Sequence, residues 1–114
     1  MKYDNEKMLE LCYSHVKVIL ETEEDLKWFK ELPEEEIVGL HHSIGTRIRN
    51  DLKLWNESVI AMWFKSLGLH HADDMSTIIL NSFHRKLNNK PILLDEQVEY
   101  YLNWWGKPEN ERYG

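Results

Sequence analysis

The sequence predicts an all-α protein, a compact single-domain bundle of about five to six short helices, on three observations. Apolar residues recur at three- and four-residue steps through most of the chain, which places them on one face of successive helices. The 114 residues are the size of one domain, and an apolar content of 42% suffices for a hydrophobic core. Short segments with polar residues, glycine or proline separate the periodic stretches. We therefore expect one domain over residues 1–114.

The first periodic stretch, residues 5–20, predicts a helix with Leu9, Cys12 and Val16 on its buried side. A strand through residues 15–20 is the alternative, because β-branched residues alternate with polar ones there. That strand would give the fold a short extended N-terminal segment, and the sequence leaves the two structures open. Cys12 is the one cysteine, so no intrachain disulfide can form.

Two helices are expected to meet at Pro33. Thr22 precedes a run of acidic residues and is a good N-cap for a short helix that ends at this proline. Because proline also suits the first position of a helix, a longer helix should begin there. Its buried face is predicted from the spacing of Ile37, Leu40, Ile44, Ile48, Leu52 and Trp55.

Capping residues predict the bounds of the later helices. Asn56 is the expected N-cap and Gly68 the expected stop of one helix, while Asp95 and Gly106 should bracket the last one. Residues 106–114 are polar and are expected to form a loose tail.

Residues 40–80 contain nearly every unusual polar residue. Asp73 or Asp74 is expected to cap the helix that begins there, and the guanidinium of Arg49 to form an ion pair with one of them. Such a pair would lock the start of one helix to the face of another. Because seven residues make nearly two turns, His42 should lie on almost the same helix face as Arg49. The candidate binding residues of this run are His42, Arg47, Arg49, Asn50, His71, Asp73 and Asp74.

Gly45 lies in the same run, and a glycine inside a helix costs about 1 kcal/mol relative to alanine. It leaves a dent that either a neighbouring helix or a bound group could fill, and the neighbouring helix is the favoured interpretation.

The alternative to a structural lock is a ligand or metal site. If folding brought His42 to His71 and Asp73, they would form a group suited to zinc or manganese. The paired histidines lack the four-residue spacing of a helical zinc site, so we predict no metal and no cofactor. Serines lie near histidines, but no nucleophile elbow or phosphate-binding loop accompanies them. This favours a protein that is not an enzyme without deciding the question.

Two motifs in the central run belong to a recognisable pattern. They are GTRIRN followed by LW, and HADDMS, at residues 45–55 and 71–76, with a closing Trp105. The pattern resembles an uncharacterised domain family of bacterial and phage-associated proteins, catalogued as a domain of unknown function. Members have proline where Ala72 stands here. The resemblance covers residues 22–105 and leaves the helix within residues 1–21 outside it. It implies no reaction, but it implies that a set of residues belongs together, namely Gly45, Arg49, Asn50, Trp55, His71, Asp73, Asp74 and Ser76.

The net charge of −6 is concentrated at the N-terminal end. Residues 1–36 hold eleven acidic and five basic residues, whereas residues 37–114 hold nine of each. Without an excess of Lys and Arg, direct binding to nucleic acid is disfavoured, and a protein partner with a basic surface fits better. The acidic partner surface would comprise Glu23, Glu24, Glu34, Glu35 and Glu36.

The sequence also predicts a cytoplasmic protein that is not in a membrane. No apolar run approaches the ~18 residues that a membrane helix needs. The N-terminus lacks a basic region followed by an apolar signal core.

These observations favour a small acidic module that binds another protein, such as an inhibitor, an immunity-type protein or a phage counter-defence factor. One alternative is a ligand- or metal-binding protein or enzyme that uses the His/Arg/Asp group. Another is a homo-oligomeric structural component held together by surplus aromatic residues. The aromatic residues in question are Trp28, Trp63, Trp104 and Tyr100.

Overall fold

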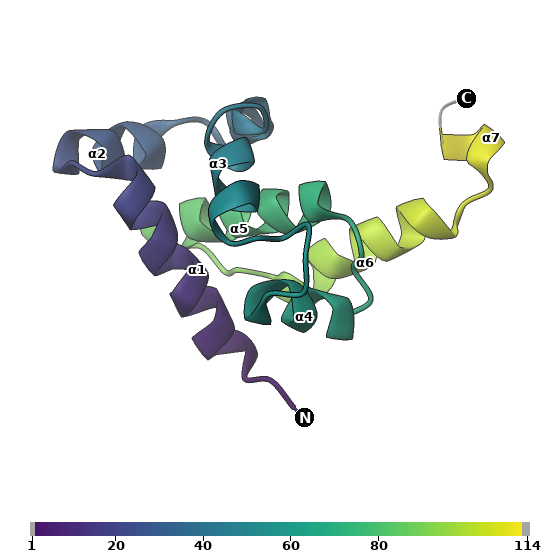
Figure 1. Ribbon diagram of the computed structural model, residues 1–114. Coiled ribbons are helices and arrows are strands. Elements are labelled where there is room, and N and C mark those ends of the chain that lie inside the picture. Colours follow the sequence, from purple (N-terminus) through teal and green to yellow (C-terminus); the bar gives the residue numbers. More distant parts are fainter. Residues whose placement is uncertain (1, 113–114) are drawn as a thin grey trace.

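Helix α5 (Ala72–Leu87) lies at the centre of the protein, and the helices from α1 to α6 pack against it. The computed structural model describes residues 2–112. Figure 1 shows α1 along one edge of the molecule and α6 leading away from the body towards α7. The other elements, in chain order, are α1 (Asn5–Leu20), α2 (Glu23–Glu31), the 3₁₀ helix η1 (Glu34–Leu40), α3 (Ile44–Asp51), α4 (Val59–Ser66), α6 (Leu94–Gly106) and α7 (Glu109–Arg112).

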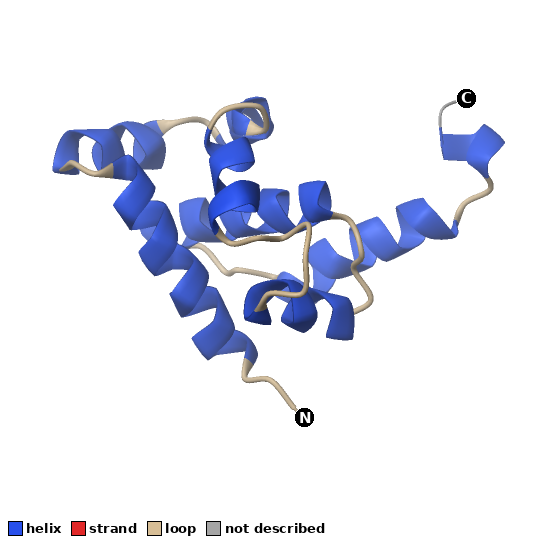
Figure 2. Cartoon of the chain, viewed as in Figure 1, coloured by secondary structure: helices blue, strands red, loops and turns tan. Residues whose placement is uncertain are grey.

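Within residues 2–112 the chain has eight helices and no strand, as Figure 2 shows. The expected number of five to six helices is therefore wrong. One extra helix arises because the helix expected from Pro33 to Trp55 is split into η1 and α3. The other is α7, which lies in the expected tail at residues 106–114, whose last two residues are outside the described range.

Residues 15–20 form the last part of helix α1. The predicted helix is therefore confirmed, and the alternative of a strand at these residues is wrong. Asp4 caps this helix by accepting a hydrogen bond from the Lys7 N–H at 3.2 Å. Its inner face, including Cys12, is buried against the core as expected.

One hydrophobic cluster fills the space between α5 and its neighbours. Tyr13 of α1 and Phe29 of α2 both contact Phe83 of α5, at ring-centroid distances of 5.4 and 5.8 Å. Trp63 of α4 is fully buried in the same cluster, and its indole N–H donates to Asn5 Oδ1 at 2.8 Å. Its assignment to an exposed aromatic interface is therefore wrong.

The break between η1 and α3 shapes the polar site. Ser43 has φ −112° and ψ −94°, outside the helical region, and its N–H and hydroxyl both turn back to the carbonyl of Leu40, at 3.2 and 3.3 Å. The carbonyl of His41 accepts from side chains instead, from Thr46 Oγ1 at 3.4 Å and Arg49 Nη2 at 3.1 Å. Because these side-chain donors satisfy the carbonyl, the backbone can leave the helix at little cost.

Several predicted helix bounds hold and others do not. Thr22 caps α2, Gly68 follows α4 with φ 97°, and α6 ends at Gly106, all as expected. Asn56 is not a cap, because Ser58 caps α4 by accepting from the Ala61 N–H at 3.1 Å.

The predicted aspartate caps are wrong as well. Helix α5 follows His71 with no side-chain cap, and α6 follows Leu93 at φ 54°. The three aspartates lie in the first turns instead, where their charge still suits the positive end of the helix dipole, at Asp73, Asp74 and Asp95.

Candidate functional site

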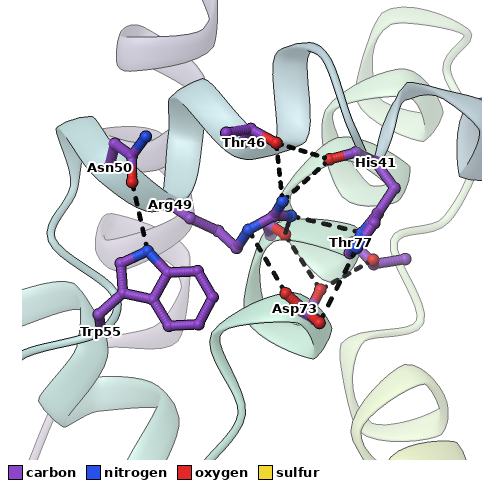
Figure 3. Close-up of polar contacts among 8 residues, drawn as sticks. His41, Thr46, Arg49, Asn50, Trp55, Asp73 and Thr77 are labelled. Carbon is purple, nitrogen blue, oxygen red and sulfur yellow. Dashed lines mark hydrogen bonds and ion pairs between the residues drawn. The ribbon is translucent and has the colours of Figure 1, made fainter.

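Arg49 is the centre of the polar cluster, on the last turn of α3. Its side chain is only 5% exposed, and its guanidinium donates three hydrogen bonds to oxygen atoms and a longer one, from Nη1 to His41 Nδ1 at 3.3 Å. Nη2 bonds to the His41 carbonyl at 3.1 Å and to Thr46 Oγ1 at 2.9 Å, and Nη1 bonds to Ser76 Oγ at 2.9 Å. Figure 3 shows these contacts converging on the guanidinium from the η1–α3 break and from α5. One side chain therefore connects α3, the break and α5.

The predicted ion pair forms with Asp73 and not with Asp74. Arg49 Nε lies 3.4 Å from Asp73 Oδ1, and His41 Nε2 lies 3.8 Å from Asp73 Oδ2 (Figure 3). The Nε–H is in ion-pair range of the carboxylate but makes no hydrogen bond, because the geometry is poor. Since the Asp73 side chain is 55% exposed, water screens this pair and limits its energy.

The dent at Gly45 is filled by the protein itself. A Cβ at this position would lie 3.2 Å from Arg49 Nη1 and 3.2 Å from the Leu40 carbonyl oxygen. The glycine is therefore needed so that the guanidinium can approach the helix backbone. The Leu40 carbonyl is the end of the neighbouring helix η1, as the favoured interpretation expected, whereas the Arg49 side chain, from α3 itself, was not expected there.

His42 lies outside the cluster, and His41 takes the place expected for it. The ring of His42 is exposed and meets His41 edge-on at 4.8 Å, whereas His41 contacts both Arg49 and Asp73. The expectation for His42 assumed two continuous turns up to Arg49. The break at residues 41–43 changes the helix phase, and nothing in the residues around Ser43 predicts the break.

Asn50 and Trp55 form a second contact beside Arg49. The Trp55 indole N–H donates to Asn50 Oδ1 at 3.3 Å, and the Arg49 Cζ lies 5.9 Å from the ring centroid (Figure 3). Trp55 is 61% exposed, so its expected place in the core is wrong. Its ring covers the guanidinium at a distance that allows a cation–π interaction.

Arg47 is not part of this cluster. It is exposed on the other side of α3, where its Nε lies 3.3 Å from Asp51 Oδ2. His15 of α1 contacts the same carboxylate oxygen at 3.1 Å. Arg47 therefore belongs to a surface contact between α1 and α3.

Asp74 and His71 are brought together by Trp105 of α6. Asp74 Oδ2 accepts the Trp105 indole N–H at 2.8 Å, and the His71 ring stacks on the same indole at 3.8 Å and 17°. Burial raises the pKa of Asp74, and the hydrogen bond from Trp105 offsets only part of this effect. Nearby, burial raises the pKa of Tyr101 to about 12.

A small pocket of about 180 Å³ adjoins the cluster. Its lining is mixed, with an indole, ring nitrogens, an amine and one carboxylate, from Leu54, Trp55, Lys65, His70, His71, Ala72 and Asp73. Among residues 2–112, no group of three or more His, Cys, Asp or Glu side chains is arranged to hold a metal ion. The Nη1 and Nη2 groups of Arg49 donate to Ser76, Thr46 and His41, and the Nε–H lies beside the Asp73 carboxylate.

The acidic candidates differ in what they contact. Glu34 Oε1 lies 2.8 Å from Arg85 Nη2, and its Oε2 lies 3.7 Å from Lys90 Nζ. Glu34 is therefore an internal partner rather than free acidic surface. The other four are exposed and form no ion pair with any residue in the described part of the chain, namely Glu23, Glu24, Glu35 and Glu36.

Comparison with known families gives one match. The model of the domain of unknown function DUF6794 matches residues 7–87, which is more than half of the chain. The chain belongs to this family. The matched part of the DUF6794 domain runs from the first turns of α1 to the last residue of α5, so it includes the Arg49 cluster and leaves out Trp105. It also includes most of the N-terminal helix that the motif resemblance left out.

No curated protein and no solved structure matches this chain. No helix within residues 2–112 combines the length and apolar character needed to cross a membrane.

Proposed function

We propose that this DUF6794 domain is a non-catalytic module that binds a basic surface of another protein through an acidic segment, residues 21–36. The observation that carries the proposal is the set of exposed carboxylates in α2 and η1. Within residues 2–112, the carboxylates of Glu23, Glu24, Glu35 and Glu36 form no ion pair. Unpaired charge of one sign raises the rate at which an oppositely charged partner associates.

Trp28 supplies an apolar anchor in the same segment. It is 47% exposed, whereas the next residue, Phe29, is fully buried. Glu24 and Glu31 lie four residues before and three residues after it, so they flank it on that helix face. Tryptophan is enriched among residues that contribute most binding energy in protein interfaces.

The Arg49 cluster supports a role without catalysis. The hydrogen bonds of its guanidinium end on groups of the same chain, and they join the break to α5. We assign this cluster a structural role, which leaves the surface to mediate function. A cytoplasmic inhibitor, an immunity-type protein or a phage counter-defence factor would each use such a surface.

The test begins with affinity purification of the tagged domain from its native cells, followed by measurement of association with each retained protein over a range of salt concentrations. A triple variant, Glu23→Lys, Glu24→Lys and Glu35→Lys, should associate more slowly and lose most of the salt dependence. The matched control reverses exposed charges elsewhere, with Glu57→Lys, Glu109→Lys and Glu111→Lys. If both triple variants slow association equally, or neither does, the acidic segment is not the binding surface.

A further inference from the structure

A groove with mostly apolar walls lies between the start of α1 and the start of α6. Its volume is about 520 Å³, within the range of roughly 300–1,000 Å³ that is usual for pockets that bind a ligand. The two walls come from stretches far apart in the sequence, within residues 5–9 and 92–96. The apolar part of the lining consists of Leu9, Ile92, Leu93 and Leu94. The groove can therefore receive an apolar side chain.

Leu93 presents an apolar side chain in this groove from an unfavourable backbone conformation. It has φ 54° and ψ 45°, in the left-handed region that residues other than glycine enter at an energetic cost, and it is 43% exposed. Gln97 fixes this conformation, because its Nε2 donates to the Ile92 carbonyl at 2.8 Å and its backbone N–H donates to the Leu93 carbonyl at 3.0 Å. Strained residues of this kind cluster at ligand-binding sites.

The opposite wall of the groove is held in place as well. The indole N–H of Trp63 in α4 donates to Asn5 Oδ1 at 2.8 Å, which fixes the first residue of α1. Leu9 lies one turn later and is buried in the core. Because both walls are formed before a ligand arrives, little conformational entropy is lost when it binds.

The rim of the groove is negatively charged. No lysine, arginine or histidine is among the described residues that line it. Three acidic residues in the lining are exposed and form no ion pair within residues 2–112, namely Glu6, Asp95 and Glu96. Each carboxylate suits the positive end of its own helix, but the meeting of the two helix starts brings all three to one apolar surface.

This combination selects the chemistry of the partner. The rim attracts a segment that carries lysine or arginine, and the lining gains from covering an aliphatic or aromatic side chain. Ligands that carry phosphate groups, such as nucleic acids and anionic lipids, are repelled by the same rim.

We propose that this groove binds a peptide segment of another protein in which an aliphatic or aromatic side chain is flanked by lysine or arginine residues. The apolar side chain enters between Leu9 and Leu93. The flanking cations pair with Glu6 on one wall and with Asp95 and Glu96 on the other. The groove is separate from the acidic segment of residues 21–36, so the proposal does not depend on the proposed function.

Selection from a phage-displayed library of random peptides on the full chain provides the probe. The wild type should enrich peptides that combine an aliphatic or aromatic residue with neighbouring lysine or arginine. One enriched peptide, synthesised with a fluorophore, is then titrated with each variant, and fluorescence anisotropy gives the dissociation constant over a range of salt concentrations.

Leu93→Asn tests the apolar wall. It removes the apolar side chain and should raise the dissociation constant of the peptide about tenfold. Asparagine tolerates the left-handed conformation better than leucine, so this variant should fold at least as stably as the wild type, which urea denaturation will measure. The matched control is Val18→Asn, at a residue that is 62% exposed outside the groove, and it should leave binding unchanged.

Neutralising the rim tests the charge complementarity. A triple variant with Glu6→Gln, Asp95→Asn and Glu96→Gln should raise the dissociation constant about tenfold and remove most of its salt dependence. A second triple variant makes the same change in net charge within the acidic segment and should leave binding nearly unchanged. Its substitutions are Glu23→Gln, Glu24→Gln and Glu35→Gln.

Each other result overturns the proposal. If no peptide is enriched, the groove has no peptide ligand, and if the enriched peptides lack lysine and arginine, the rim does not select the partner. If the control variants weaken binding as much as the groove variants do, the peptide binds elsewhere on the chain. A wild-type dimer in sedimentation equilibrium that Leu93→Asn dissociates would show that the occupant is a second copy of this chain.

Discussion

Replacing Arg49 by alanine tests whether the buried guanidinium holds the fold together. The change removes hydrogen bonds to Ser76 Oγ, Thr46 Oγ1 and the His41 carbonyl. At about 1 kcal/mol net for each, these three contribute about 3 kcal/mol, and the longer bond of 3.3 Å to the partly exposed His41 ring adds little. The ion pair with Asp73 adds no more than about 0.5 kcal/mol, because that carboxylate is more than half exposed and is rehydrated when its partner is removed.

The groups that accept hydrogen bonds from Arg49 keep other partners in the Arg49→Ala variant, which limits the loss of stability. Ser76 Oγ still donates to the Asp73 carbonyl, and Thr46 Oγ1 still donates to the His41 carbonyl, so none of the three groups is left without a partner. The full cost of a stranded buried polar group is therefore avoided. We expect Arg49→Ala to lower the free energy of unfolding by about 3 kcal/mol.

Arg47 provides a matched control two residues away in the same helix. Its side chain is half exposed and pairs with Asp51 one turn later. Arg47→Ala should therefore cost about 0.5 kcal/mol or less. Arg49→Lys should lie between the two alanine variants, because an ammonium group cannot reproduce the planar fork.

Urea denaturation followed by far-UV circular dichroism measures all three variants. The slope against urea must stay the same for the free energies to be compared. If Arg49→Ala costs less than about 1 kcal/mol, similar to Arg47→Ala, the guanidinium does not lock the break to α5. In that case the cluster would be better explained as a binding site that the fold tolerates.

Three further predictions concern single groups. Gly45→Ala should destabilise the protein by about 1 kcal/mol despite its better helix propensity, because the new Cβ crowds the anchored guanidinium and a backbone carbonyl, and urea denaturation will measure it. Asp74→Asn should be more stable than the wild type at neutral pH. The raised pKa of Asp74 means that folding favours its protonated form, so the stability of the wild type falls as pH rises through the folded-state pKa. Below the usual carboxyl pKa of about 3.9, the wild type and Asp74→Asn should be equally stable. Burial raises the pKa of Cys12 to about 12, so a thiol reagent at pH 8 should react with it only when urea unfolds the chain, and fast reaction in the native state would contradict its burial.

Added zinc or manganese distinguishes the structural interpretation from the metal-site alternative. A ligand that binds the native state raises the melting temperature. Since the histidines and aspartates do not form a three-ligand group within residues 2–112, neither ion should shift the melt. A concentration-dependent rise that His71→Ala abolishes would show that the pocket beside Trp55 binds metal.

The long-range ion pair could be predicted because its chemistry is specific. A buried arginine needs a carboxylate, and few carboxylates lie beside the candidate helix starts. The sequence could not distinguish Asp73 from Asp74, because both lie in the first turn of α5 and the choice depends on where Trp105 lies. That position is set by the packing of α6, far away in sequence.

The helix break could not be predicted because its cause is tertiary. Periodicity continues from Ile37 through Ile48, so nothing local opposes one helix. The carbonyl of His41 accepts hydrogen bonds from Thr46 and Arg49, and the Arg49 side chain is in turn bonded to Ser76 of α5, which lies far along the chain. Because of the same break, His41 contacts Arg49 in place of the predicted His42. Trp55, the last residue of the predicted buried face, lies at the surface.

The contacts of α6 bear on how this protein should be produced in the laboratory. The family match ends at residue 87, and a natural choice of gene fragment would stop there. Such a fragment would lack Trp105, which contacts Asp74 and His71, and Val98, which is buried in the core. It would expose apolar surface on α5 and invite aggregation during expression. Cloning boundaries are better placed beyond residue 106, even though conventional practice would follow the edge of the family.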